Sequence, residues 1–295
     1  LFGLVLLTVA VGSGLPGGGQ IAYASGQDGD LDIYLLDLAR GITFNLTRTP
    51  EDETQPDWSP DGSQMVFAAS RDGNTDLYIL QVNCPSFFST CTAPIRRLTS
   101  EIGGDVDPAW SPDGTQIAFT SDGFGSSEIL VIDASGGERQ RLTNNDRLDA
   151  NPAWSPDGRQ IVFSSDRDVQ WNTDLYLIDA DGSNVRSLLQ TPDNEFSAAW
   201  SPDGNRLAFG SSGTANGQLA ILDVESGQVR PLLDDQGYDG EPAWSPDGET
   251  LALSSFRDGD YEVYTLRIDC TSTPTDCLHR LTFDPALDRM AVWRP

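Results

Sequence analysis

The stretch Pro-Ala-Trp-Ser-Pro-Asp-Gly, residues 152–158, contains a pentapeptide that the chain repeats. Trp-Ser-Pro-Asp-Gly begins at Trp58, Trp110, Trp154, Trp200 and Trp244, and Trp293-Arg-Pro is a truncated sixth copy. Successive copies are 52, 44, 46, 44 and 49 residues apart, in or near the length range of one β-propeller blade. A leucine lies twelve residues before every one of these tryptophans, so the differences in length are confined to other loops of the unit.

Each unit is predicted to form four short strands. Typical examples are Pro152–Trp154 for the first strand, Ile117–Thr120 for the second, Asp174–Ile178 for the third, and a fourth that ends at Leu142-Thr143. These runs are rich in β-branched and aromatic residues and are bounded by Gly, Pro and Asp, as strands are. Ser-Pro-Asp-Gly has the composition of a tight turn. Because no long stretch shows a helical period, we expect an all-β fold with almost no helix.

The two ends of the repeat predict how the fold closes. Residues 20–23 align with the second strand of a unit, so the chain enters its first blade without a first strand. Residues 290–293 supply the missing strand at the other end of the chain. Pairing residues 290–293 with residues 20–25 closes the ring and leaves no open sheet edge. We therefore predict a six-bladed β-propeller over residues 16–295.

Residues 1–15 lie outside the repeat and form a separate segment. Residues 1–11 are apolar and are followed by a Gly-rich linker. Eleven residues are too few to cross a bilayer, which takes about 20. The segment is interpreted either as the end of a signal peptide or as the end of a transmembrane helix. Both interpretations place the propeller in the periplasm or outside the cell, with an N-terminal membrane anchor in the second case.

Composition excludes several functions. The chain has 45 acidic and 18 basic residues, all of the latter Arg, and a formal net charge of −27. Such a charge argues against nucleic acid as a partner, because phosphates are neutralised by basic surfaces. The absence of Lys excludes Schiff-base chemistry, and a single histidine, His279, cannot build a His-based metal site.

The succession Pro-Ala-Trp-Ser-Pro-Asp-Gly, Ile-Ala-Phe, Arg-Asp-Gly, Asp-Leu-Tyr and Leu-Thr is similar to the WD40-like (PD40) repeat of TolB-type six-bladed propellers. The resemblance covers about residues 16–295 and implies the fold more specifically than the function. Related propellers accompany hydrolase domains in prolyl-oligopeptidase-like peptidases or form lyases with a His-bound metal. This sequence has no Gly-x-Ser-x-Gly and only His279. We therefore expect no catalytic residues and no enzymatic activity.

A carboxylate lies five residues before each repeated tryptophan. Because first strands are innermost in a propeller, these residues are expected to surround one mouth of the central channel, with Gln55, Asp107, Asn151, Ser197 and Glu241 deeper inside. Either each acid caps its own loop through backbone N–H groups, or the ring binds a cation such as Ca²⁺ or a basic peptide. The ring consists of Glu53, Asp105, Asp149, Glu195, Asp239 and Asp288.

Two further features stand outside the repeat pattern. The cysteines form two pairs with the same spacing, Cys84/Cys91 and Cys270/Cys277, both between third and fourth strands. We predict one disulfide within each pair, on the face opposite the acidic ring, and hence an oxidising compartment. Trp171, in a longer loop between second and third strands, is either an exposed binding anchor or part of the packing of that loop.

Three hypotheses about function follow. The first is a non-catalytic exported propeller, expected to be a monomer without a resident metal, that binds a protein or basic peptide through its loop face and channel mouth. The second is the extracytoplasmic sensor domain of a membrane-anchored protein, for example a receptor kinase. The third, ranked last, is a degenerate propeller of a peptidase or lyase family.

Overall fold

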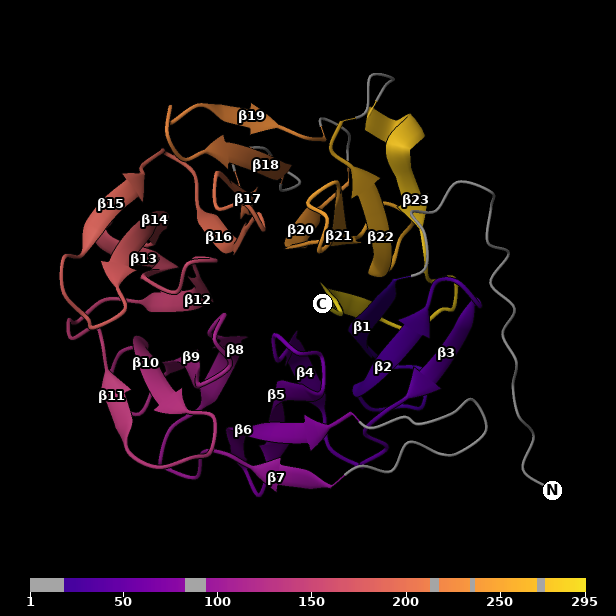
Figure 1. Ribbon diagram of the computed structural model, residues 1–295, viewed down its shortest axis with the longest axis horizontal. Coiled ribbons are helices and arrows are strands. Elements are labelled where there is room, and N and C mark those ends of the chain that lie inside the picture. Colours follow the sequence, from indigo (N-terminus) through magenta and orange to yellow (C-terminus); the bar gives the residue numbers. More distant parts are fainter. Residues whose placement is uncertain (1–18, 83–93, 213–217, 234–236, 270–273) are drawn as a thin grey trace.

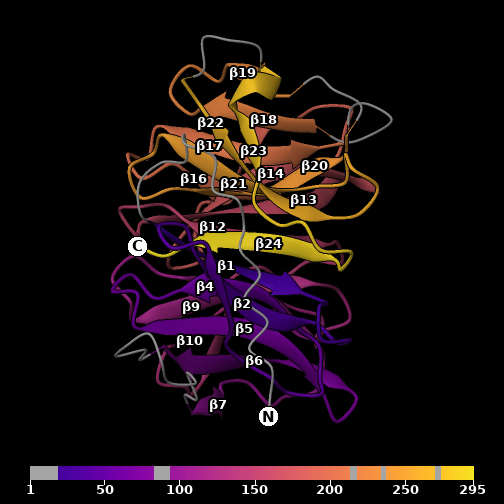
Figure 2. The ribbon, with the colours of Figure 1, turned by 90° about the vertical axis from the view of Figure 1, so that its right-hand side faces the viewer.

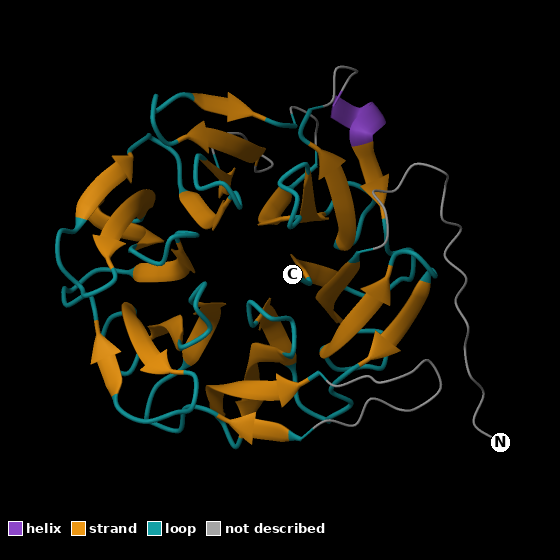
Figure 3. Cartoon of the chain, in the orientation of Figure 1, coloured by secondary structure: helices purple, strands orange, loops and turns teal. Residues whose placement is uncertain are grey.

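The computed structural model describes residues 19–82, 94–212, 218–233, 237–269 and 274–295. In this part of the chain, twenty-four strands form six four-stranded antiparallel sheets. The sheets stand around a common axis like the blades of a ring (Figures 1 and 2). The only helix there is the short 3₁₀ helix η1 (Pro274–Cys277), as Figure 3 shows. The predicted all-β six-bladed propeller is therefore confirmed.

Each blade is named here by its four strands, from the axis outward. Blade 1 consists of β24 (Asp288–Trp293), β1 (Gln20–Ser25), β2 (Asp32–Asp37) and β3 (Ile42–Asn45). Blade 2 consists of β4 (Glu53–Trp58), β5 (Gln64–Arg71), β6 (Asn74–Gln81) and β7 (Ile95–Arg97). Blade 3 consists of β8 (Asp105–Trp110), β9 (Gln116–Ser121), β10 (Glu128–Asp133) and β11 (Arg139–Arg141).

The other three blades continue the same order around the ring. Blade 4 consists of β12 (Asp149–Trp154), β13 (Gln160–Val169), β14 (Asn172–Asp179) and β15 (Arg186–Leu189). Blade 5 consists of β16 (Glu195–Trp200), β17 (Arg206–Ser211), β18 (Gln218–Asp223) and β19 (Val229–Pro231). Blade 6 consists of β20 (Asp239–Trp244), β21 (Thr250–Ser255), β22 (Glu262–Arg267) and β23 (Leu278–Arg280).

Blade 1 closes the ring by combining the two ends of the repeat. Strand β24 pairs with β1, with Trp293 opposite Ile21 and Val292 opposite Ala22. The same strand also contacts the innermost strands of both neighbouring blades, β20 and β4. The predicted pairing of residues 290–293 with residues 20–25 is confirmed. Strand β24 thus covers the inner edge of β1, and blade 1 is complete.

Two strand boundaries differ from the prediction. The first strand starts three residues earlier than expected, because Asp149 and Ala150 already pair with Ser165 and Ser164. The fourth strand ends before the Leu-Thr pair rather than at it. The reason is that the threonine side chain continues the ladder, as Thr143 Oγ1 accepts the backbone N–H of Ile129 at 2.9 Å.

Every first strand contains a β-bulge at its third residue. The pairing register shifts there in all six blades. The third residue has a left-handed backbone, with φ of 55° at Gln55, 51° at Asp107, 53° at Asn151, 51° at Ser197, 52° at Glu241 and 58° at Met290. A regular strand would point its second and third side chains to opposite faces. The bulge instead leaves both of them partly exposed.

The Ser-Pro-Asp-Gly turn both reverses the chain and locks one blade against the next. In blade 4, Asp157 Oδ1 accepts Ser155 Oγ at 2.7 Å and the backbone N–H of Arg159 at 3.1 Å. Gly158 has φ of 69°, and a Cβ there would lie 3.3 Å from the ring of Pro112 in blade 3. Glycine is therefore required by the turn geometry and by the close approach of the neighbouring proline.

The closing strand is expected to carry much of the stability. Trp293 in β24 is only 9% exposed, whereas Trp171 is 82% exposed. Replacing the buried indole leaves a cavity, so Trp293→Ala should lower the free energy of unfolding by about 3–5 kcal/mol. Trp171→Ala, the matched control, should change it by less than about 0.5 kcal/mol. Urea denaturation measures both, and equal effects would contradict this account of ring closure.

Candidate functional site

The six ring carboxylates are the first residues of the six innermost strands. Their exposed fractions are 0–1%, so they lie beneath the surface rather than in an open mouth as expected. Each is placed by the antiparallel pairing of its strand with the end of the second strand, for example Asp149 opposite Ser165. Buried carboxylates need donors around them, and four of the six have an arginine among the described residues.

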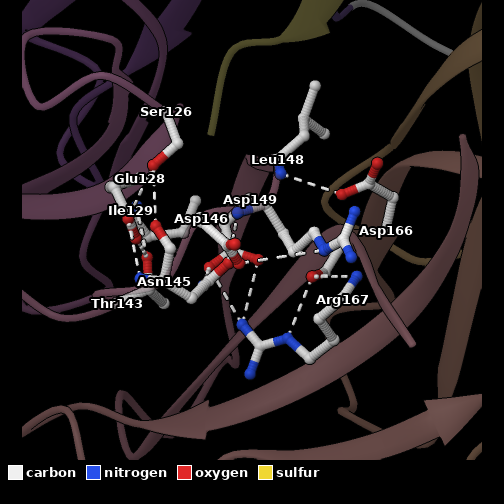
Figure 4. Close-up of polar contacts among 12 residues, drawn as sticks. Ser126, Glu128, Ile129, Thr143, Asn145, Asp146, Leu148, Asp149, Asp166 and Arg167 are labelled. Atoms are coloured by element: carbon white, nitrogen blue, oxygen red, sulfur yellow. Dashed lines mark hydrogen bonds and ion pairs between the residues drawn. The ribbon is translucent and has the colours of Figure 1, made fainter. Parts of the chain in front are cut away.

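Asp149 shows this arrangement clearly (Figure 4). Its two oxygens both accept Arg167 Nη2 at 2.9 Å, and Oδ2 also accepts Asn145 Nδ2 at 2.6 Å. Arg167 is held in turn by Ser165, whose Oγ accepts Arg167 Nε at 2.9 Å. The carboxylate is therefore part of a network inside the protein and is not presented to a ligand.

The same arginine position recurs in alternate blades. Arg71 pairs with Glu53 at 3.0 Å in blade 2, and Arg257 pairs with Asp239 at 2.8 Å in blade 6. Blade 3 has no arginine at this position, and Asp105 is instead paired with Arg139 at 3.2 Å. The donors that the structure gives these four acids are side chains, mainly arginines, and so differ from the backbone N–H groups of the loop-capping interpretation.

A second set of buried acids lies beside the ring, and our sequence analysis did not identify it as a set. Glu128, the first residue of β10, accepts Thr143 Oγ1 at 2.6 Å and the N–H of Asn145 at 2.9 Å. Asn145 therefore joins Glu128 to Asp149 across the junction of blades 3 and 4 (Figure 4). The signal was present in the sequence as the acid that opens the Asp-Leu-Tyr motif. The set consists of Asp32, Asp76, Glu128, Asp174 and Glu262.

Glu195 and Asp288 are the two ring carboxylates without an arginine in the described part of the chain. Glu195 accepts Thr191 Oγ1 at 2.7 Å but leaves Oε2 without a partner there. Burial raises the pKa of Glu195 to about 7, with the Asp174 charge adding to the effect. Neither oxygen of Asp288 has a hydrogen-bond partner among the described residues. Burial, followed by the charge of Asp284, raises the pKa of Asp288 to about 8.

The reason for the isolation of Asp288 is visible in blade 1. Gln27 occupies the position that Arg71, Arg167 and Arg257 hold in their blades. Its amide donates to Asp284 Oδ2 at 2.8 Å instead. The blade that closes the ring therefore buries a carboxyl group whose pKa is raised by burial, where its neighbours bury ion pairs.

The acids closest to the axis are not those of the ring. Asp107 accepts Thr120 Oγ1 at 3.0 Å, and Glu241 accepts Ser254 Oγ at 2.7 Å. Burial raises the pKa of Asp107, and the charge of Glu241 raises it further. Because these two residues belong to blades 3 and 6, on opposite sides of the ring, their repulsion acts across the axis. Both were expected as the deeper polar positions.

Asp57 is a third acid of the inner strands, and our sequence analysis missed it. It stands immediately before Trp58, where four other repeats have alanine. Its Oδ2 accepts the N–H of Trp110 in the next blade at 2.7 Å. Burial raises the pKa of Asp57 to about 7. Aligning the repeats would have revealed it, as Pro-Asp-Trp among copies of Pro-Ala-Trp.

Trp171 lies at the end of the β13–β14 hairpin with its side chain exposed. Its backbone has φ of 68°, and its N–H donates to Asp166 Oδ2 at 3.0 Å. Asp166 also accepts the N–H of Leu148 at 2.9 Å (Figure 4). Of the two interpretations of Trp171, the exposed one agrees with the structure.

Cys277 is the one cysteine within the described residues. It is not a free thiol, and it ends η1 between β22 and β23. That connection starts from the end of β22 where Arg267 pairs with Thr250, opposite the end that carries Asp239. Cys84, Cys91 and Cys270 lie outside the described residues, so both pairings stay predictions.

We expect peptide mapping under non-reducing conditions to recover Cys84 linked to Cys91 and Cys270 linked to Cys277. The short spacing within each pair favours these links over links between blades. Four free thiols, or links between the two pairs, would contradict the prediction. A reduced and alkylated sample serves as the control.

Two further structural findings bear on function. Among the residues that the structure describes, no three His, Cys, Asp or Glu side chains are grouped so that they could hold a metal ion. No helix of the described ranges is long and apolar enough to cross a membrane.

The fold and the inner strands define the class, which is a six-bladed propeller whose innermost strands begin with buried carboxylates and carry further acids near the axis. The TolB β-propeller domain (PD40) family model matches residues 13–93, 87–174 and 170–295, so the chain belongs to this family. Recognition of the family from its repeat is therefore confirmed.

Similar proteins show how far the likeness extends. A TolB homologue of Chlorobium luteolum is 42% identical over 43 residues, which is 15% of this chain and only 10% of that relative. The crystal structure of TolB from Acinetobacter baumannii has a TM-score of 0.76 at 22% identity, covering 94% of this chain and 67% of TolB. An oligogalacturonate lyase in complex with manganese has a TM-score of 0.58 at 16% identity, covering 88% and 73%. At these identities the two structures show likeness of fold alone.

Asp288→Asn should stabilise the protein increasingly as pH rises. The folded state holds the Asp288 proton up to about pH 8, whereas the unfolded chain releases it near pH 4. Stability therefore falls through this window by at most about 1.4 kcal/mol per pH unit, and the amide removes that dependence. Urea denaturation at pH 5 and pH 8 measures the difference between variant and wild type.

The control for this prediction is Asp149→Asn. That change removes the negative charge paired with Arg167, so it should destabilise the protein by about 3 kcal/mol at pH 7. A loss of stability in Asp288→Asn that does not depend on pH would show that the carboxyl group has a partner after all.

Proposed function

We propose that the chain is a non-catalytic, exported binding module that holds a partner protein, or a basic segment of one, on one face of the propeller. This face carries the loops between second and third strands and the loops that enter the first strands. The TolB-like propeller fold is one that supports protein interaction in general. Beyond protein interaction in general, we propose which face binds, that the partner is basic, and that the chain is not catalytic.

The distribution of exposed apolar side chains is the observation that carries this proposal. Ten large apolar side chains are exposed in the described part of the chain, and eight of them lie on this face, with only Val185 and Val229 at the other end of the sheets. Clusters of exposed apolar side chains mark interaction sites on soluble proteins. The eight are Ile102, Phe124, Leu148, Val169, Trp171, Phe256, Phe283 and Leu287.

Charge determines which partner suits this face. The net charge of −27 favours association with a basic partner over long distances. In this proposal the direct acidic contacts come from Asp107 and Glu241 near the axis. The buried ring from Glu53 to Asp288 holds the inner strands in place and adds its potential. Calcium is the small cation to test at the same acids, since it prefers oxygen ligands.

The two alternative functions, a sensor ectodomain and a degenerate enzyme, have fewer observations in their favour. A sensor ectodomain uses the same face and differs only in what precedes residue 1, and the apolar residues 1–11 support export in either case. The lyase likeness concerns the fold, and His279 is the one histidine of the chain. We therefore propose binding without catalysis, in the periplasm or outside the cell.

A fluorescent nine-residue oligoarginine peptide tests the proposed face by anisotropy. Asp107→Asn with Glu241→Gln should weaken binding about tenfold at low salt, because two charges near the axis are lost. Glu138→Gln with Glu225→Gln removes the same charge from exposed positions at the opposite end of the sheets and should change affinity less than about twofold. Equal losses in both variants would leave only the net charge as the cause.

A further inference from the structure

Four aromatic rings form a continuous row on the loop face, across blades 5 and 6. Phe196 stacks on Tyr238 with centroids 6.4 Å apart and planes 8° from parallel. Tyr238 meets Tyr261 edge to face at 6.0 Å, and Tyr261 contacts Phe256 at 5.1 Å. Phe256 is 46% exposed and the other three are partly exposed. The row therefore presents aromatic surface to a ligand and is not part of the core.

Gly210 makes room for the row. Phe196 lies opposite Gly210 in the pairing of β16 with β17. A Cβ at Gly210 would be 2.4 Å from Phe196 Cε2, whereas a Cβ at Gly240 would be 3.5 Å from the same atom, an ordinary contact distance. The position of Gly210 is held by Ser164 in blade 4 and by Ser254 in blade 6. A serine at residue 210 would displace the ring of Phe196.

The row already holds one cation, from within the protein. The guanidinium of Arg289, in the first strand of blade 1, lies 4.9 Å from the centroid of the Tyr261 ring. Glu241 accepts Arg289 Nε at 3.2 Å and also binds Nη2. An aromatic face with a carboxylate beside it is a setting that suits arginine better than lysine, because the planar guanidinium both stacks and forms paired hydrogen bonds.

The surroundings of the row determine what else can bind there. Phe196, Gly240 and Arg289 occupy the same second position in the innermost strands of three successive blades. Glu241 is the next residue along β20, and Asp107 of β8 lies across the axis from it, close enough for the charge of Glu241 to raise its pKa. A neutral sugar would also stack on such rings and donate hydrogen bonds to the carboxylates, but it gains no attraction from the net charge of −27. The charge therefore favours a basic ligand.

We propose that the row of Phe196, Tyr238, Tyr261 and Phe256 is a binding surface for arginine side chains of an extended basic segment of a partner protein. The segment lies over the row, with its guanidinium groups stacked on the rings, and continues toward Asp107 and Glu241 at the axis. This inference rests on the proposed function, because it specifies which residues of the loop face select the partner and which basic side chain they select.

The test compares labelled nine-residue oligoarginine and oligolysine peptides, which carry the same charge. Wild type should bind oligoarginine about fivefold more tightly than oligolysine, in line with stacking on exposed rings. Phe256→Ala removes an exposed ring and should bring the two affinities within about twofold of each other. Gly210→Ser should do the same by displacing Phe196. Trp171→Ala, which removes an exposed ring from another blade of the same face, should keep the full preference, and circular dichroism checks the fold of each variant.

The outcomes separate this inference from the proposed function. Equal affinities for both peptides in wild type, with binding still weakened by Asp107→Asn with Glu241→Gln, would overturn the aromatic row and leave the acidic face standing. A preference lost in Trp171→Ala but kept in Phe256→Ala would also overturn it. Displacement of oligoarginine by the neutral oligosaccharide maltoheptaose would show that the row binds sugar. No binding of either peptide would contradict the proposed function itself.

Discussion

The innermost strand of each blade begins with a buried carboxylate, and the fold depends on compensating that charge. An ionised carboxylate loses several kcal/mol of hydration on burial, a loss comparable to the net stability of a whole domain. In three blades the chain compensates this loss with arginine, in Arg71–Glu53, Arg167–Asp149 and Arg257–Asp239. Arg71 and Arg167 lie in the second strand of their blades and Arg257 follows it by two residues, so each ion pair ties the hairpin to the innermost strand of the same blade.

Blade 1, which closes the ring, lacks this ion pair between an arginine and the first residue of the innermost strand. In blade 1 the arginine is replaced by Gln27, and the buried carboxyl of Asp288 has its pKa raised to about 8. Closure by two ends of the chain, β24 beside β1, therefore rests on strand pairing and on Trp293 rather than on an ion pair. A neutral carboxyl group is the less costly state where no cation is available.

The second and third residues of the innermost strands, and the loop face above them, differ from blade to blade. The bulge at the third residue of each innermost strand turns two successive side chains out of the sheet, and these carry Phe196, Glu241 and Arg289 on one side of the ring. On the other side the second positions are small or aliphatic, such as Val106 and Ala150. The six blades share one fold, but the side chains that they present near the axis differ from blade to blade.

The amino-acid sequence by itself determined the blade number, the closure and the six carboxylates, because these follow from a repeat whose register is kept around every tryptophan. Whether the carboxylates face a ligand or an arginine was decided only by the tertiary structure. Asp149 and Arg167 are 18 residues apart, and the pairing of β12 with β13 brings them together. The aromatic row likewise joins residues 196 to 261 from two blades. A repeat shows what each blade has in common, whereas a site depends on where neighbouring blades differ, and only packing places those differences side by side.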